Sequence, residues 1–161
     1  MVRRTRSATF VLLALASSMT AAGCARAVDL KQTLQVTGVS TGWFDMGIVD
    51  GKNKLVPSIT FSLQNRSDEE LAVQMNIVFM LLPQKEERDD VFLQRVEIPP
   101  AAASKPTTVR SQYGFTGEQP RAEMLQHRLF QDFQVRLFVK YGSAQWVALG
   151  DFPIERRLLT R

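Results

Sequence analysis

Strict alternation of apolar and polar residues in the middle of the chain is the feature that most limits its fold. Within Val56–Asn65, the apolar residues Ile59, Phe61 and Leu63 alternate with polar ones. A period of two places alternate side chains on one face of a β-strand, so one face of this segment is expected to be buried. The chain is therefore expected to be mainly β. The same period returns in Leu71–Leu82 and Phe133–Tyr141.

Shorter runs of the same character complete the pattern. They are separated by turn signals such as Asp50-Gly51, which is typical of hairpins. Pro120 opens the one segment with helical spacing, and a short helix is expected over residues 120–130. About seven short strands without alternating helices predict a single antiparallel β-sandwich. The further expected strands are Leu30–Ser40, Trp43–Val49, Val91–Ile98, Thr107–Phe115 and Ala144–Phe152.

One stretch within this pattern has a familiar form. The residues from Phe61 to Ser67, followed by a strand at Leu71, resemble a signature of immunoglobulin-like domains in bacterial cell-envelope proteins. The resemblance implies that Phe61 and Leu63 point inward and that Asn65-Arg66-Ser67 makes the turn into the next strand. It implies an immunoglobulin-like sandwich but little about function, because such sandwiches host many functions.

The N-terminus has the three parts of an export signal. Arg3, Arg4 and Arg6 precede any acidic residue, an apolar stretch runs from Ala8 to Met19, and small residues follow. The apolar stretch has about a dozen residues, whereas a membrane-spanning helix needs ~20. The segment therefore predicts export with cleavage and not a permanent transmembrane anchor.

The small residues Ala21-Ala22-Gly23 and the following Cys24 resemble the lipobox of bacterial lipoproteins, in which Leu is usual at the position of Ala21. The resemblance implies that residues 1–23 are a cleaved signal peptide and that Cys24 carries a diacylglyceryl group. Two or more acyl chains hold a protein stably at a membrane. Residues 24–29 then form a short lipidated tether, and residues 30–161 form the β-sandwich domain.

The expected location is the cell envelope. Residue 25 is Ala and not Asp, which by the sorting habit of enterobacterial lipoproteins implies an outer membrane anchor facing the periplasm. An alternative remains open: Ala25-Arg26-Ala27 is an ordinary signal-peptidase site. Cleavage after Ala27 would discard Cys24 and release a soluble secreted domain.

Removing the signal changes the charge of the protein. The full chain carries +4, but three arginines leave with residues 1–23, so 17 basic residues face 16 acidic ones. A nearly neutral mature chain gives no support to nucleic-acid binding. Cys24 is the only cysteine. Once it is lipidated, the domain has no thiol for a disulfide or a cysteine metal site.

No catalytic or metal-binding constellation is visible in the sequence. His127 is the only histidine and is expected at the surface or partly packed. The sequence shows no nucleophile motif for which it could act as a general base. We therefore expect no enzyme activity, no metal and no cofactor. Trp43 and Phe44 are the candidate partner contacts, because adjacent residues of a strand face opposite ways and one of them is expected outside the core. Trp146 is expected in the core.

These observations favour a non-enzymatic binding or accessory module for an envelope protein partner, held at a membrane by lipid on Cys24. A carrier that holds a lipid or other apolar molecule between its sheets is the alternative. The two hypotheses differ in one structural property, since only a carrier needs a large apolar cavity.

Overall fold

The structure is a computed structural model that describes residues 28–159. The predicted signal peptide, Cys24 and the rival cleavage site after Ala27 lie outside the described residues. Among the described residues, the chain forms nine strands and two short helices. These are α1 (Leu30–Thr33), β1 (Leu34–Val49), β2 (Lys52–Asn65), β3 (Leu71–Leu81), β4 (Glu86–Ile98), β5 (Thr107–Arg110), β6 (Phe115–Gly117), α2 (Arg121–Gln126), β7 (Phe133–Lys140), β8 (Val147–Pro153) and β9 (Leu158–Leu159).

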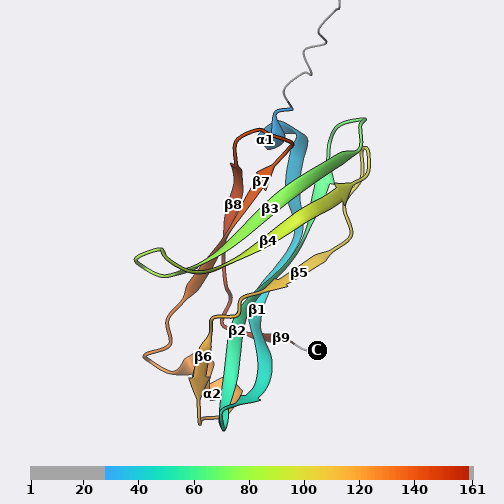
Figure 1. The fold of residues 1–161 in the computed structure, drawn as a ribbon. Helices are drawn as coiled ribbons and strands as arrows, with labels where there is room; N and C mark the ends of the chain where they lie inside the picture. The colour runs from blue at the N-terminus through green and yellow to red at the C-terminus, as the bar shows by residue number, and fades with distance from the viewer. Residues whose placement is uncertain (1–27, 160–161) are drawn as a thin grey trace, which may run out of the picture.

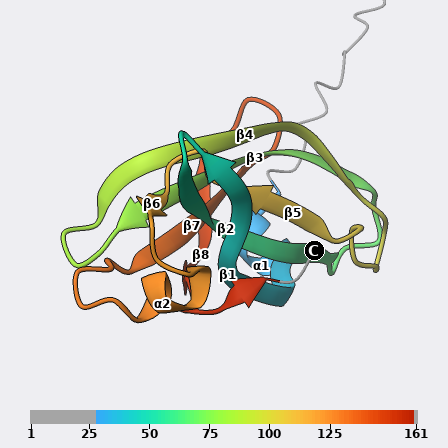
Figure 2. The same ribbon diagram turned by 90° about the horizontal axis from the view of Figure 1, so that it is seen from below.

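The strands form two sheets that face each other (Figures 1 and 2). One sheet, here called sheet A, has the order β5-β2-β1-β9, with β6 also paired to β2. The other, sheet B, has the order β4-β3-β7-β8. The mainly β prediction is confirmed. The named strands pair in the antiparallel sense that was predicted, with one exception: β9 runs parallel to β1, so sheet A is mixed. The structure also has more strands than the seven or so expected, since β5, β6 and β9 are very short.

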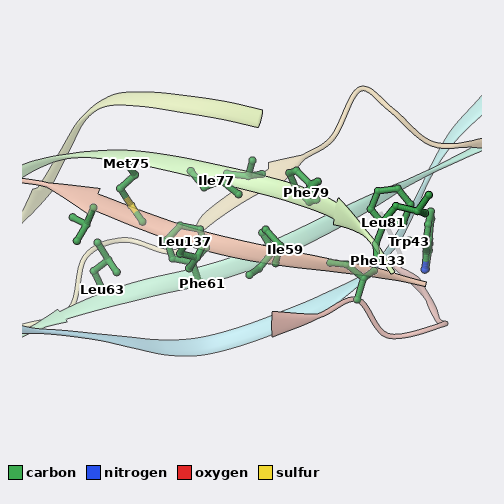
Figure 3. Packing of buried hydrophobic residues seen from close by; sticks show 14 of the residues in the cluster. Trp43, Ile59, Phe61, Leu63, Met75, Ile77, Phe79, Leu81, Phe133 and Leu137 are labelled. Carbon is green, nitrogen blue, oxygen red and sulfur yellow. The ribbon is translucent and has the colours of Figure 1, made fainter. Parts of the chain in front are cut away.

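The core lies between the two sheets, where the alternating strands predicted it. Along β7, buried and partly exposed residues alternate without a break. Ile59, Phe61 and Leu63 of β2 are at most 1 % exposed. They face the inward side chains of β3 and β7, among them Met75, Ile77, Phe79 and Leu137 (Figure 3). Burial of this apolar surface is the main source of stability in such a domain.

The first predicted strand begins later and ends later than expected. Residues 30–33 form α1, because the Asp29 carboxylate accepts hydrogen bonds from the free amides of Lys31 (3.1 Å) and Gln32 (3.4 Å). The expected break after Ser40 does not occur. Gly42 continues the strand and allows close packing, since a Cβ there would lie 2.7 Å from a side-chain carbon of Leu159.

The predicted helix at 120–130 is present but ends at Gln126. The guanidinium of Arg156 explains the early end, because it donates hydrogen bonds to the carbonyl oxygens of Leu125 (3.3 Å) and Phe130 (2.9 Å). The amide of Leu129, which would bond to Leu125 in a longer helix, donates to Nδ1 of His127 instead. Arg156 also donates to Asp132 at 2.6 Å, and this hydrogen bond raises the pKa of Arg156 above its ordinary value.

Arg156 is therefore expected to stabilise the fold. Replacing it by glutamine should lower the free energy of unfolding by about 1–2 kcal/mol, because two carbonyls lose a charged donor. Chemical denaturation measures the loss. Arg128→Gln removes the same charge from an exposed side chain and should stay within about 0.5 kcal/mol of wild type. Equal losses in the two variants would contradict the structural role of Arg156.

Candidate functional site

The two ends of the domain differ in their relation to Cys24. Val28, the first described residue, is four positions after Cys24 in the sequence, and a chain of that length spans at most ~14 Å. The described chain enters α1 at one end, here called the proximal end, where the turn between β7 and β8 also lies (Figure 1). The β1–β2 turn, β6 and α2 lie at the opposite, distal end (Figure 1).

Trp43 lies wholly inside the core, with 0 % of its surface exposed. Its ring centroid is 4.5 Å from that of Phe130 and 5.7 Å from those of Phe115 and Phe133. This corrects the proposed contact role of Trp43. The inward face of β1 meets an aromatic cluster that the loops around α2 complete, and the sequence pattern does not show these loops.

Phe44, the neighbour of Trp43, faces the other way and is half-buried. The guanidinium carbon of Arg110 lies 3.4 Å from the centroid of the Phe44 ring, so the cation covers part of the ring. The opposite orientation of the two neighbours follows from the alternation of a strand. Phe44 thus stays a candidate contact, but one that a partner would have to share with Arg110.

Exposed large apolar side chains occur near both ends of the domain. Met46, Ile48 and Leu129 are 48 %, 72 % and 72 % exposed. They belong to the end of β1 and the loop after α2, and we call them the distal apolar residues. Phe92, Tyr141 and Trp146 are 51 %, 38 % and 42 % exposed, and we call them the aromatic patch. Single exposed apolar residues are ordinary, whereas groups of them mark interaction surfaces.

The aromatic patch grows out of the outer face of sheet B. The register aligns Phe92 of β4 with Asn76 of β3, and Asn76 with Phe138 of β7, so all three face outward. The turn after β7 carries Trp146 to this row. The ring centroids of Trp146 and Phe92 are 6.1 Å apart at an interplanar angle of 78°. The Nζ atom of Lys140 lies 5.8 Å from the centroid of the Trp146 ring.

The exposure of Trp146 corrects its expected place in the core. The strand predicted from Ala144 begins only at Val147, and residues 141–146 form a turn that lies outside the sheet. Beside this turn, the surface has a hollow of about 540 Å³. The hollow is lined by Glu70, Ala72, Arg95, Tyr141 and Gly142.

Elsewhere on the outer face of sheet B, polar side chains cover the apolar ones. Arg136 of β7 and Asp151 of β8 form a bidentate pair at 2.5 and 2.7 Å. Hydrogen bonding from Arg136 holds the pKa of Asp151 below its usual value, so the pair stays ionised. Val78, which is aligned with Arg136, is only 6 % exposed. On the outer face, Val78 is thus buried beside polar side chains, whereas Phe92 is exposed beside an aromatic one.

A larger hollow lies at the edge of the domain beside β4. Its volume is about 660 Å³, and we call it the edge hollow. Leu93, Val96 and Pro99 supply apolar walls, while Arg95 and Lys105 supply cationic ones. The hollow therefore opens beside an edge strand and does not lie at the centre of the core.

The described residues show little that resembles a catalytic centre. His127 is exposed, and its Nδ1 atom accepts a hydrogen bond from the Leu129 amide at 3.3 Å. Within residues 28–159, no group of three or more histidine, cysteine, aspartate or glutamate side chains gathers to hold a metal ion. None of the helices in this part of the chain has the length and apolar character to cross a membrane.

The aromatic patch was missed in the sequence although a signal for it exists. In Val91-Phe92-Leu93 the two aliphatic residues are aligned with the inward residues Ile77 and Met75 of β3. A period of two then sends Phe92 outward. Trp146 could not be placed in the same way, because its position depends on the length of the turn before β8.

Comparison with known proteins gives structural neighbours of low similarity. No family model matches the chain, and no curated protein matches it. The X-ray structure of a target of the Northeast Structural Genomics Consortium is 14 % identical, with a TM-score of 0.45, over 78 % of this chain and 88 % of that one. A crystal structure of a protein from Archaeoglobus fulgidus is 13 % identical, with a TM-score of 0.39, over 75 % of this chain and 98 % of that one.

Proposed function

We propose that this protein is a lipid-anchored component of the bacterial cell envelope whose β domain binds a protein partner without catalysing a reaction. The observation that carries the proposal is the N-terminal sequence, in which a basic start and an apolar stretch lead to Ala21-Ala22-Gly23-Cys24. The proposed location is the periplasmic face of the outer membrane. The proposed partner is an envelope protein, and no nucleic acid or cofactor is involved.

The local geometry around Asn65 supports an immunoglobulin-like identity for the domain. Phe61 and Leu63 point inward and are at most 1 % exposed, as that resemblance implies. Oδ1 of Asn65 accepts hydrogen bonds from the amide (2.9 Å) and the hydroxyl (2.8 Å) of Ser67, which shapes the turn into β3. Domains of this class host many functions, and binding through loops at one end of the sandwich is one of them.

The shape of the domain supports a partner site at the distal end. A lipid on Cys24 would hold the proximal end near the bilayer, because the intervening chain spans at most ~14 Å. The sixteen residues of β1 run from α1 to the distal end and would span roughly 50 Å if fully extended. Met46, Ile48 and Leu129 are then the exposed apolar side chains best placed for a partner away from the membrane.

The carrier alternative has one observation in its favour, which is the edge hollow of about 660 Å³. Its walls include Glu70, Arg95, Glu97 and Lys105 as well as apolar side chains. Sites for apolar ligands are lined mainly by apolar groups with few polar ones. The hollow therefore fits an apolar ligand less well than the anchor and the distal apolar residues fit a tethered binding module.

Mass spectrometry of the intact mature protein tests the anchor. We expect a chain that begins at Cys24 and carries a diacylglyceryl group. Cys24→Ala should move the protein from the membrane fraction to the soluble fraction, because the acyl chains supply nearly all of the binding. Ala21→Leu, which restores the usual lipobox residue, should leave the protein in the membrane fraction. A mature chain that begins at Val28 would instead support cleavage after Ala27 and contradict the anchor.

A further inference from the structure

We propose that the aromatic patch is a second membrane contact, in which Phe92, Tyr141 and Trp146 enter the headgroup layer of a phospholipid bilayer beside Lys140. The proposal rests on the proposed lipid anchor for its geometry. Its consequence is orientation. A single point of attachment does not by itself set the orientation of a domain, whereas a second contact on one face would set the direction in which the distal end points away from the membrane.

The composition of the patch suits the boundary between water and lipid. Tryptophan and tyrosine are enriched at membrane interfaces, because their rings are apolar and their N–H or O–H groups remain hydrated. Lysine adds an apolar stem and a charged end that reaches the phosphates. Lys140 is positioned for this, since its Nζ atom lies 5.8 Å from the centroid of the Trp146 ring.

The position of the patch limits what can cover it. Helix α1 packs against β8, and Trp146 directly precedes β8. Cys24 lies six residues before Leu30, the first residue of α1. Only a few residues therefore separate the proposed acyl chains from the end of the domain that carries Trp146. We therefore expect this patch to contact a bilayer and not a protein partner.

The contrast across the outer face of sheet B points the same way. Around Val78 the face is closed by the Arg136–Asp151 pair and is suited to water. The aromatic part, by contrast, lies toward the turn between β7 and β8, which is at the proximal end (Figure 1). An aromatic surface at the anchored end and a polar surface farther along is the arrangement expected of a domain that tilts this face onto a membrane.

The two tryptophans make the contact measurable. Trp43 is 0 % exposed and Trp146 is 42 % exposed, so a quencher in the bilayer can reach Trp146 but not Trp43. We would place the lipidated protein in vesicles of phosphatidylethanolamine and phosphatidylglycerol that contain brominated phospholipid. The emission of Trp146 should be quenched. Trp146→Phe should abolish the quenching and leave the emission of Trp43 unchanged.

A second measurement separates the patch from the anchor. The mature chain with Cys24→Ala should still bind the same vesicles weakly, and Trp146→Ser in that chain should lower its partition coefficient by about tenfold. Ile48→Ser removes an apolar residue that is more exposed but distal, and it should leave the partition coefficient unchanged. Circular dichroism confirms that each variant is folded.

The possible outcomes are distinct. A protein that is lipidated and vesicle-bound but not quenched would overturn the membrane contact and leave the anchor intact. A mature chain without lipid would overturn the anchor, while vesicle binding that depends on Trp146 would still support the patch. In native membranes, a photo-crosslinker at position 146 should label lipid. Labelling of a protein instead would overturn the proposal.

Discussion

Replacing Trp43 by alanine is expected to lower the free energy of unfolding by about 3–5 kcal/mol, which is the usual cost of removing a fully buried aromatic side chain. Trp43 is 0 % exposed and contacts Phe115, Phe130 and Phe133, which come from three separate segments. The cavity would therefore loosen β6, the loop after α2 and the start of β7 together. A domain of this size is stable by about 5–15 kcal/mol, so a large share of its stability would be lost.

Urea denaturation measures this loss, and Trp146→Ala is the matched control. Trp146 is 42 % exposed and lies outside the strands, so its removal should cost less than about 1 kcal/mol. The two variants delete the same side chain, so they differ only in environment. Similar losses for both would contradict the placement of Trp43 in the core and of Trp146 at the surface.

The alternating segments were predictable because the pattern itself records which side chains are buried. Phe133, Val135 and Leu137 recur at a period of two, and all three are 0 % exposed in β7. A strand with one buried face needs no knowledge of its partner to be recognised. The register with β3 and β8, by contrast, depends on the other strands and was not available from the pattern.

The C-terminus shows what local patterns do not contain. Leu158 and Leu159 form β9 alongside Trp43 and Phe44, more than a hundred positions earlier in the chain. Arg157 secures this pairing by donating to the carbonyl of Thr41 at 2.9 Å. Two residues carry no periodicity, so neither the strand nor its parallel direction could be predicted.

The candidate contacts show the same limit in another form. Alternation predicts that Trp43 and Phe44 face opposite ways, and they do. It does not say which face is covered, because the cover of Trp43 comes from Phe115 and Phe130. The described residues give no test of Cys24, so the anchor remains a prediction of the sequence.

The other large effect is expected at Asn65, a fully buried polar residue at the end of β2. Its Nδ2 atom donates to the carbonyls of Glu69 (2.7 Å) and Pro99 (3.1 Å), and its Oδ1 atom accepts from the amide and hydroxyl of Ser67. Asn65→Ala should lower the free energy of unfolding by about 3 kcal/mol, because several groups lose their partners at once. Urea denaturation measures this change.

Asn53→Ala is the matched control, since its Nδ2 atom makes one exposed hydrogen bond, to the carbonyl of Gln119. Its loss should be at most about 1 kcal/mol. Asn65→Asp separates the donor from the acceptor. It keeps the acceptor for Ser67 but turns a carboxylate toward the carbonyls of Glu69 and Pro99, which disfavours the charged form and raises the pKa of the new carboxyl group. Its destabilisation should therefore be greatest at neutral pH and shrink as the pH falls toward 4.

The pH dependence decides how Asn65 acts. If its donors hold the β2–β3 turn to Pro99, protonating the new carboxyl group removes the repulsion and restores one donor, so stability must rise on acidification relative to wild type. Pro99, which follows β4, also lines the edge hollow, and so does Glu70 at the end of the β2–β3 turn. Loss of these hydrogen bonds should therefore widen the edge hollow as well as destabilise the fold. A variant whose deficit does not change with pH would show that Asn65 contributes packing and not its two donated hydrogen bonds.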